Sequence, residues 1–463
     1  MSTAAFNILS LPIEITTEIF FHALPSERTL TLLPLDAPLV FLAVCKTWNQ
    51  IAESTPTLWR FLRLYISPPD FRKADDATFL AGLERWFLCC GERLGLLFKL
   101  SGSVDCIAWI LRSETFRSHA SSISSLELTP INHASEAATI ELPELSNLRA
   151  FEWVKLPYDH GRGGPVSLAV GPHYPQLRWA FIRYAIPSEL ALPWQQLTEF
   201  HCRLSTVSQV LEFIRLLPNV VRFESLMMSN SKEQRTLDAK HEVVHSTLQH
   251  LRIEHYYTPS PTKRAALEFI TAPNLKSLRT DVPRSTFTTF LQRSRFPSLT
   301  YLDLDVCNEP REWDFHVDGF ISQLTSLVEL HLRDLAVCTS NSLFRHLPEE
   351  SFLPNLRTLA VKCRREAGDE ARDRDPASLL LEESAEPCPF SAILLLAGSA
   401  VANRLGLQVA HLGSLQLLER VPEDASLDVV IPDEVQEVYK NLRDLGVRVH
   451  IRLTTDVDFE VEY

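Results

Sequence analysis

The stretch Leu299-Thr-Tyr-Leu302-Asp-Leu304-Asp-Val-Cys307 carries the pattern that decides the fold. An apolar residue is followed by two residues of any kind, a second apolar residue, one residue of any kind and a third apolar residue. The alternation from Leu302 to Leu304 is typical of a strand with one buried face, because successive side chains of a strand point to opposite faces. Further copies of this pattern begin at Ile123, Leu148, Leu177, Leu197, Val220, Leu248, Leu275, Leu327 and Leu356.

Successive copies start 20 to 29 residues apart, which matches the period of about 20–29 residues of leucine-rich repeats. One such unit cannot bury its own apolar face, so neighbouring units must stack. The chain is therefore predicted to be an α/β protein whose main domain, residues 74–363, is an irregular leucine-rich-repeat solenoid. Irregularity is expected because only Cys307 carries a preferred residue type at the position where regular repeats have asparagine. Helix-like stretches separate several copies, most clearly at 205–217, 263–270 and 285–293.

The N-terminal segment has a different character. Leu11, Ile15 and Ile19 recur at helical spacing and form one apolar stripe, and Pro12 suits the first turn of that helix. A second apolar helical face follows over residues 39–51. Short helices cannot bury this much apolar surface by themselves. The segment is either a small helical cap on the next domain or a surface that docks onto a partner.

Residues 8–62 resemble an F-box. The resemblance rests on Leu11-Pro12-x-Glu14-Ile15-x3-Ile19-Phe20 and on Val44-Cys45-x2-Trp48-x2-Ile51-Ala52. The ending Ser54-Thr55-Pro56-x-Leu58-Trp59 is similar to the large F-box family of mushroom-forming fungi. This resemblance implies binding to a Skp1-like adaptor and thereby to a cullin-RING ubiquitin ligase. It assigns the docking surface to Leu11, Pro12, Ile15, Ile19 and Trp48.

The function that the resemblance and the repeats imply is substrate recognition for a Skp1–cullin–F-box ubiquitin ligase. Such an adaptor is not an enzyme and needs no cofactor. It acts by raising the effective concentration of a protein substrate near the ubiquitin carrier. The alternative is a leucine-rich-repeat scaffold, bound to Skp1 or free, that acts outside ubiquitination.

A substrate face is predicted on the strands of five adjacent repeats, at the positions that point away from the core. Arginine and large aromatic side chains are enriched at interaction hot spots, and arginine can hold a carboxylate or phosphate with two bonds at once. The interleaved acidic residues leave an alternative, in which the row is a lattice of surface ion pairs that are each worth little. The predicted substrate-binding residues are Trp179, Phe181, Arg183, Arg203, Arg222, Arg252 and Arg279.

Composition limits the partners and the compartment. The 463 residues carry a net charge of −13, so the chain as a whole has no electrostatic attraction to nucleic acid or to an anionic membrane. Nine cysteines without CxxC spacing, the absence of a signal-like N-terminus and the lack of a long apolar run predict an intracellular protein, cytoplasmic or nuclear, with reduced thiols.

The last hundred residues carry weaker signals. The acidic, proline-punctuated stretch 364–388 is predicted to be a disordered insertion. Degenerate closing repeats are expected over 389–463. The final run from Asp456 to Tyr463 alternates acidic and apolar residues, which is typical either of a closing strand or of a solvated tail.

One stretch of the sequence matches the signature of a zinc enzyme. His241-Glu242-x-x-His245 matches the zincin signature, in which a helix places two histidine ligands one turn apart. Leu248 stands where a metzincin needs glycine, and Leu251 occupies the third-ligand position. The motif also abuts a strand pattern, so it is interpreted as a polar connector between repeats, and no metal site is predicted. A third ligand further along the chain, as in thermolysin-like enzymes, is the alternative that the pattern leaves open.

Overall fold

The computed structural model describes most of the chain in segments. Contacts group the chain into two compact units, Met1–Leu204 with Arg215–Val220, and Ser205–Ile214 with Val221–Tyr463. One of the boundaries between the units, after Ile214, falls inside helix α8 (Val207–Leu216). The residues described are 11–24, 32, 36–66, 76–91, 95–131, 136–155, 165–170, 174–204, 206–228, 242–255, 265–295, 298–306, 321, 323–335, 343–344, 346–348, 352–364, 397, 401, 414–420, 433–444 and 447–454.

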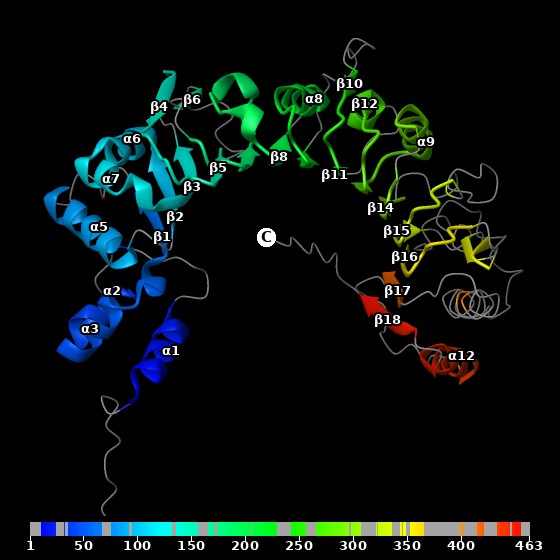
Figure 1. Cartoon of the computed structure of the whole chain (residues 1–463), viewed down its shortest axis with the longest axis horizontal. Coiled ribbons are helices and arrows are strands. Elements are labelled where there is room, and N and C mark those ends of the chain that lie inside the picture. Colours follow the sequence, from blue (N-terminus) through cyan, green and yellow to red (C-terminus); the bar gives the residue numbers. More distant parts are fainter. Residues whose placement is uncertain are drawn as a thin grey trace, which may run out of the picture. The chain divides into compact units, whose positions relative to one another are not determined.

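The first unit starts with short helices and continues as a parallel sheet. Strands β1, β2, β3, β5, β7 and β8 lie side by side in this order, and β4 and β6 form a separate parallel pair. Helices α5, α6 and α7 lie on one side of the first strands (Figure 1). The elements are α1 (Ile13–Ala23), α2 (Leu39–Val44), α3 (Lys46–Glu53), η2 (Pro56–Trp59), β1 (Phe61–Ile66), α5 (Asp76–Cys90), β2 (Leu96–Ser103), α6 (Val104–Arg112), α7 (Glu114–Ser118), η3 (Ala120–Ser122), β3 (Ile123–Ile131), β4 (Ala138–Leu142), β5 (Ala150–Val154), β6 (Val166–Val170), β7 (Trp179–Arg183), η5 (Pro187–Glu189), η6 (Trp194–Gln196) and β8 (Glu199–Leu204).

The second unit has the same construction. Its strands run parallel in the order β9, β11, β13, β14, β15, β16, β17, β18, and β10 pairs separately with β12. Helices α9 and α12 lie on the same side of these strands (Figure 1). The elements are β9 (Arg222–Met227), β10 (Val243–Val244), β11 (His250–His255), η9 (Ala266–Phe269), β12 (Ile270–Thr271), β13 (Ser277–Thr280), α9 (Arg284–Arg293), β14 (Tyr301–Asp305), β15 (Glu329–Leu335), β16 (Thr358–Arg364), β17 (Ser414–Arg420), α12 (Asp433–Asp444) and β18 (Arg448–Thr454).

The α/β class with extensive parallel sheet is confirmed. Each of the ten pattern copies leads directly into a strand, and the strands pair in register. In the second unit Leu278, Leu302, Leu330, Leu359 and Leu415 stand opposite one another from strand to strand and are all fully buried. This row is what stacking of repeated units requires.

Three details differ from the sequence predictions. The stretch 263–270 holds a short 3-10 helix, η9, followed by strand β12, in place of an α-helix. The sheet begins with β1, ahead of the predicted start at residue 74, because Phe61-Leu-Arg-Leu-Tyr-Ile66 alternates buried and exposed side chains. The single helix expected over 39–51 is two helices, because Cys45 is extended and accepts a hydrogen bond from the Trp48 backbone N–H at 3.5 Å.

An asparagine ladder connects the turns before the strands, and the sequence analysis missed it. Each asparagine side chain donates from Nδ2 to a backbone carbonyl in the preceding repeat. Three of these asparagines follow a proline. Proline suits the second position of a four-residue turn. The turns therefore explain why prolines punctuate the chain. The bonds are Asn147 to Ser121 (2.7 Å), Asn219 to Gln195 (2.6 Å), Asn274 to Ser246 (2.8 Å) and Asn355 to Thr325 (2.7 Å).

Several predictions concern residues that the structure does not describe. The acidic stretch, apart from Arg364 at the end of β16, lies outside the described residues, and so does the run from Asp456 to Tyr463. Within 389–463 the structure does describe β17, α12 and β18, which continue the parallel strand order. Among the helices of the described residues, none combines the length and the apolar character needed to cross a bilayer.

Candidate partner-binding surfaces

The N-terminal helices pack around an aromatic cluster. The Phe20 ring is fully buried and stacks on Phe41, with ring centroids 4.2 Å apart. Trp48 meets Phe20 edge-on at 5.0 Å and Phe41 at 6.1 Å. Such aromatic pairs add to the free energy gained from burial alone. Trp48, which the sequence analysis assigned to the docking surface, is therefore half-buried and packs against this cluster.

Other apolar side chains of these helices face outward. Ile13 and Ile15 on α1 are 51% and 48% exposed, and Val44 at the end of α2 is 53% exposed. Pro12 is also exposed, and Leu11 and Ile19 are half-buried. The predicted stripe thus contains side chains that the helices do not cover themselves. Ile13 and Val44 are further exposed apolar side chains, which the spacing from Leu11 did not include.

A relay of tryptophans joins the helices to the sheet of the first unit. Trp59 donates from its indole N–H to the carbonyl of Ala52 in α3 at 2.8 Å. Trp86 in α5 donates to the carbonyl of Trp59, also at 2.8 Å, and the two rings meet edge-on at 5.0 Å. Both tryptophans are fully buried. An ion pair of 2.7 Å between Glu53 and Arg85 lies on the surface. These contacts fix the helices on the sheet.

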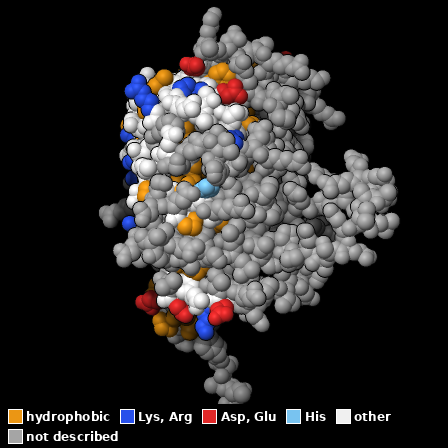
Figure 2. Space-filling view, turned by 90° about the vertical axis from the view of Figure 1, so that its right-hand side faces the viewer, with side chains coloured by type: hydrophobic (Ala, Val, Ile, Leu, Met, Phe, Trp, Pro, Cys, Tyr) orange, Lys and Arg blue, Asp and Glu red, His pale blue; other side chains and the backbone are white. Residues whose placement is uncertain are grey.

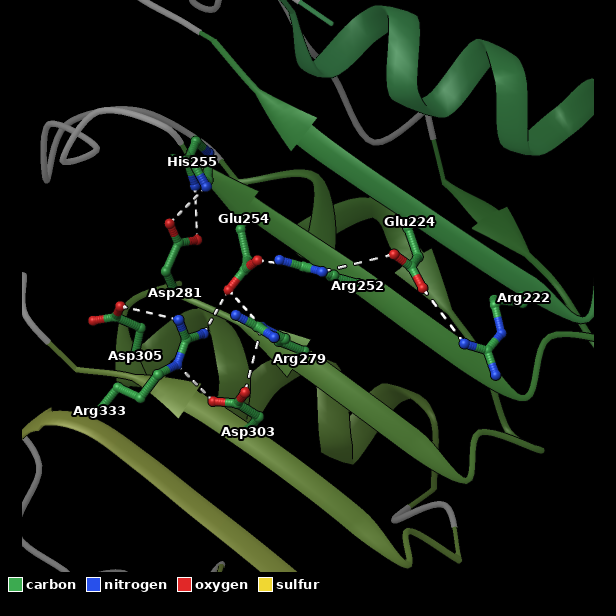
Figure 3. Close-up of polar contacts among 10 residues, drawn as sticks. All are labelled: Arg222, Glu224, Arg252, Glu254, His255, Arg279, Asp281, Asp303, Asp305 and Arg333. Carbon is green, nitrogen blue, oxygen red and sulfur yellow. Dashed lines mark hydrogen bonds and ion pairs between the residues drawn. The ribbon is translucent and has the colours of Figure 1, made fainter. Parts of the chain in front are cut away.

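A network of ion pairs covers the strand face of the second unit (Figure 3). Glu254 is its centre, with a side chain only 9% exposed. One carboxylate oxygen accepts from Arg252 at 2.6 Å, and the other accepts from Arg279 at 2.8 Å and from Arg333 at 2.5 Å. We call this network the Glu254 lattice; its other members are Arg222, Glu224, Asp303 and Asp305.

The lattice extends along neighbouring strands. Asp303 accepts from Arg333 at 2.7 Å and lies 3.3 Å from Nε of Arg279. Glu224 lies 3.8 Å from Arg252 and 3.6 Å from Arg222. The buried pair of His255 and Asp281 forms a separate contact at 2.8 Å. Acidic and basic side chains thus alternate over the whole network (Figure 3).

The charges at the centre of the lattice depend strongly on one another. Burial alone would raise the pKa of Glu254, but Arg333, Arg279 and Arg252 outweigh burial and lower that pKa to about 2. Burial would lower the pKa of Arg333, while Asp303, Glu254 and Asp305 raise it well above its ordinary value. Arg252 and Arg279, predicted as substrate contacts, therefore already hold carboxylates of their own chain. The ion pairs of the alternative are thus present, and substrate binding by these arginines stays a prediction.

The remaining predicted contact residues lie on the first unit. Trp179 and Phe181 are half-buried on β7, and the Trp179 ring meets the His201 ring at 5.6 Å. The guanidinium of Arg183 lies 5.3 Å from the centre of the Tyr184 ring. Arg203 is half-buried on β8, directly opposite Arg183. This face is therefore aromatic as well as charged.

Charged residues of both faces were missed because the sequence analysis used only five repeats. Asp303 on β14 and Arg333 on β15 occupy the same outward positions, one and two repeats beyond the last that was considered. Glu127 and Glu152 occupy them on β3 and β5, ahead of the first. The same pattern of alternation would have identified all four.

The zincin-like motif does not adopt the geometry that its signature requires. Val243 and Val244 form strand β10, which pairs with β12. His245 is buried beside Thr247 at 3.3 Å, Glu242 is exposed, and His241 lies outside the described residues. The helical spacing that would bring two histidines together is therefore absent over the described part of the motif. No group of three or more metal-binding side chains occurs among the residues that the structure describes.

Cys89 and Cys90 lie at the end of α5, where both are buried. Burial raises the pKa of each thiol to about 11, so neither is a nucleophile near neutral pH.

On the face shown in Figure 2, the hydrophobic side chains of described residues form small separate patches among polar and charged ones. That view offers no continuous apolar surface among the described residues.

Comparison with models of known protein families and with curated proteins finds no match for the chain.

Proposed function

We propose that this protein is a substrate-recognition adaptor of a Skp1–cullin–F-box ubiquitin ligase. The helices α1 to α3 act as the F-box and dock a Skp1-like adaptor, and the strands form an irregular leucine-rich-repeat solenoid that recruits a protein substrate. The chain itself makes and breaks no bond. Its contribution is to hold the substrate near the ubiquitin carrier, which raises the effective concentration of the reacting groups.

The observation that carries the proposal is the exposed apolar surface of the N-terminal helices. Ile13, Ile15 and Val44 are each about half exposed, while Phe20 and Phe41 of the aromatic cluster are buried. Exposed apolar side chains that are grouped together are typical of interaction sites. Leu11 and Pro12 directly precede α1 and Ile19 lies within it, so the predicted docking residues are close in sequence to Ile13 and Ile15.

The repeat assignment is supported by the regularity of the strands. Ten strands follow the pattern copies, buried leucines of the second unit stand in register, and an asparagine bond to the preceding repeat occurs before four of the strands. Within each unit, stacked strands of this kind present a strand face. The tryptophan relay holds the docking helices firmly on the first strands, as an adaptor that positions a substrate requires.

Binding to a Skp1-like adaptor tests the proposal. The variants Ile15→Glu and Val44→Glu should each weaken binding at least tenfold, because they place a charge into an apolar interface. Changing Leu11 and Pro12 to Ala should abolish co-purification while the circular dichroism spectrum stays unchanged.

The matched control is Val244→Glu, which makes the same change at an exposed apolar side chain on β10. It should bind as the unaltered chain does. Undiminished binding by Ile15→Glu and Val44→Glu would refute the docking assignment.

A further inference from the structure

One row of side chains crosses the strand face of the first unit. Strand pairing places Lys99, Glu127, Glu152, Phe181 and His201 directly opposite one another on β2, β3, β5, β7 and β8. Neighbouring strands lie about 4.8 Å apart, so each side chain adjoins the next. Lys99 forms an ion pair with Glu127.

Two carboxyl groups in this row adjoin each other, and Lys99 pairs with one of them. Glu127 and Glu152 are both half-buried and hydrogen-bond to each other through their side chains. Burial, followed by repulsion from Glu127, raises the pKa of Glu152 to about 7, against smaller opposing effects of Lys99 and His201. A positive charge placed beside the pair would lower the pKa of Glu152 and favour its ionised form.

Aromatic rings border the carboxyl pair. Phe181 stands opposite Glu152, and Trp179 packs against His201 at 5.6 Å. A cation held over an aromatic face is attracted to the ring, and more strongly where water is excluded. Carboxylates beside half-buried rings thus suit the end of a lysine or arginine side chain.

We propose that this carboxyl–aromatic face, made of Glu127, Glu152, Phe181 and Trp179, binds a lysine or arginine side chain of a partner protein. The proposal rests on the proposed function, in which that partner is the recruited substrate, and it names the partner's chemistry. It reverses the acidic partner that the arginine row had indicated. The net charge of −13 also favours the approach of a cationic segment.

Other charged groups lie on or beside the same strands. They are Lys99 on β2, Arg183 on β7, His201 and Arg203 on β8, and Lys155 after β5. Lys155 forms an ion pair with Glu189 at 3.3 Å. Lys99 already contacts Glu127, and the Arg183 guanidinium lies over Tyr184.

Selection from a library of random twelve-residue peptides displayed on phage tests this. The immobilised full chain, held at pH 8, should enrich peptides with lysine or arginine at one fixed position. The double variant Glu127→Gln/Glu152→Gln should bind the selected peptides at least tenfold more weakly. Phe181→Leu should weaken them less. The matched control Glu199→Gln, which removes an exposed carboxylate opposite Trp179 on the same face, should bind as the unaltered chain does.

The pH dependence provides a second measurement that needs no double variant. Since about one tenth of the Glu152 carboxyl groups are ionised one pH unit below their pKa, the selected peptides should bind about tenfold more weakly at pH 6 than at pH 8. Glu152→Gln should remove most of that dependence, whereas a dependence that arises elsewhere in the chain would survive it.

Enrichment of acidic peptides, no enrichment over the double variant, or equal binding at both pH values would overturn the proposal. Binding of Skp1 by the same protein sample distinguishes such a failure from failure of the proposed function.

Discussion

Replacing Glu254 with Gln removes the charge at the centre of the lattice while keeping the size of the side chain. Its pKa falls from an ordinary 4.5 to about 2 in the folded chain. A difference of this size corresponds to about 3 kcal/mol of stabilisation at pH 7, and breaking a buried ion pair typically costs about 3–5 kcal/mol. We expect Glu254→Gln to lower the free energy of unfolding by about 3 kcal/mol, measured by urea denaturation followed by circular dichroism.

The matched control is Glu224→Gln, whose ion pairs are 3.6 and 3.8 Å long and whose side chain is more exposed. It should cost less than about 1 kcal/mol. Because the folded pKa of Glu254 lies below the unfolded one, its stabilisation is complete above about pH 5 and is lost as the pH falls towards 2. The difference between the unaltered chain and Glu254→Gln should therefore shrink to about 2 kcal/mol at pH 3.5. Equal costs for the two variants, or a difference that does not change with pH, would refute the central place given to Glu254.

Two further predictions concern the packing of the repeats and of the docking helices. Asn274→Ala removes the bond to the Ser246 carbonyl and should lower the free energy of unfolding by about 1 kcal/mol, measured by urea denaturation. The control is Asn441→Ala, which changes an exposed asparagine of α12 and should cost less. Equal losses for the two variants would count against the asparagine ladder. Trp86→Phe removes the buried bond to Trp59 and should cost about 2–3 kcal/mol; a loss below about 1 kcal/mol, by thermal denaturation, would show that the relay is not a structural joint.

The positions of the strands could be predicted from the sequence because one rule governs them. Leucines that alternate with polar residues bury one face, and a period near that of known repeats sets the stacking. The prediction of a helix over 263–270 was wrong. The apolar residues of this stretch suit either a helix or a short 3-10 turn with a strand, and local spacing does not distinguish the two. The break at Cys45 was missed for a similar reason. Its spacing fits a helix, but its extended backbone is set by the cap that it gives to Trp48.

The ion pairs and hydrogen bonds of the strands and turns were harder to predict from the sequence. The outward positions of Arg252 and Arg279 follow from alternation, but alternation does not tell which neighbouring carboxylate each guanidinium will hold. That depends on strand register, which places Glu254 within reach of three arginines. The asparagine ladder was missed because it lies before the strand, whereas regular repeats have their asparagine after it. A comparison of the residues just before each pattern start would have revealed it.

The central claim, that the chain joins a cullin ligase through Skp1, is tested most directly by assembly from purified components. The full chain, a Skp1-like adaptor and a cullin should elute together in size-exclusion chromatography with the mass of one copy of each, and Ile15→Glu should leave the chain outside that complex. A chain that binds Skp1 but excludes the cullin would support a scaffold outside ubiquitination and contradict the ligase assignment. A chain that binds neither would contradict the account as a whole.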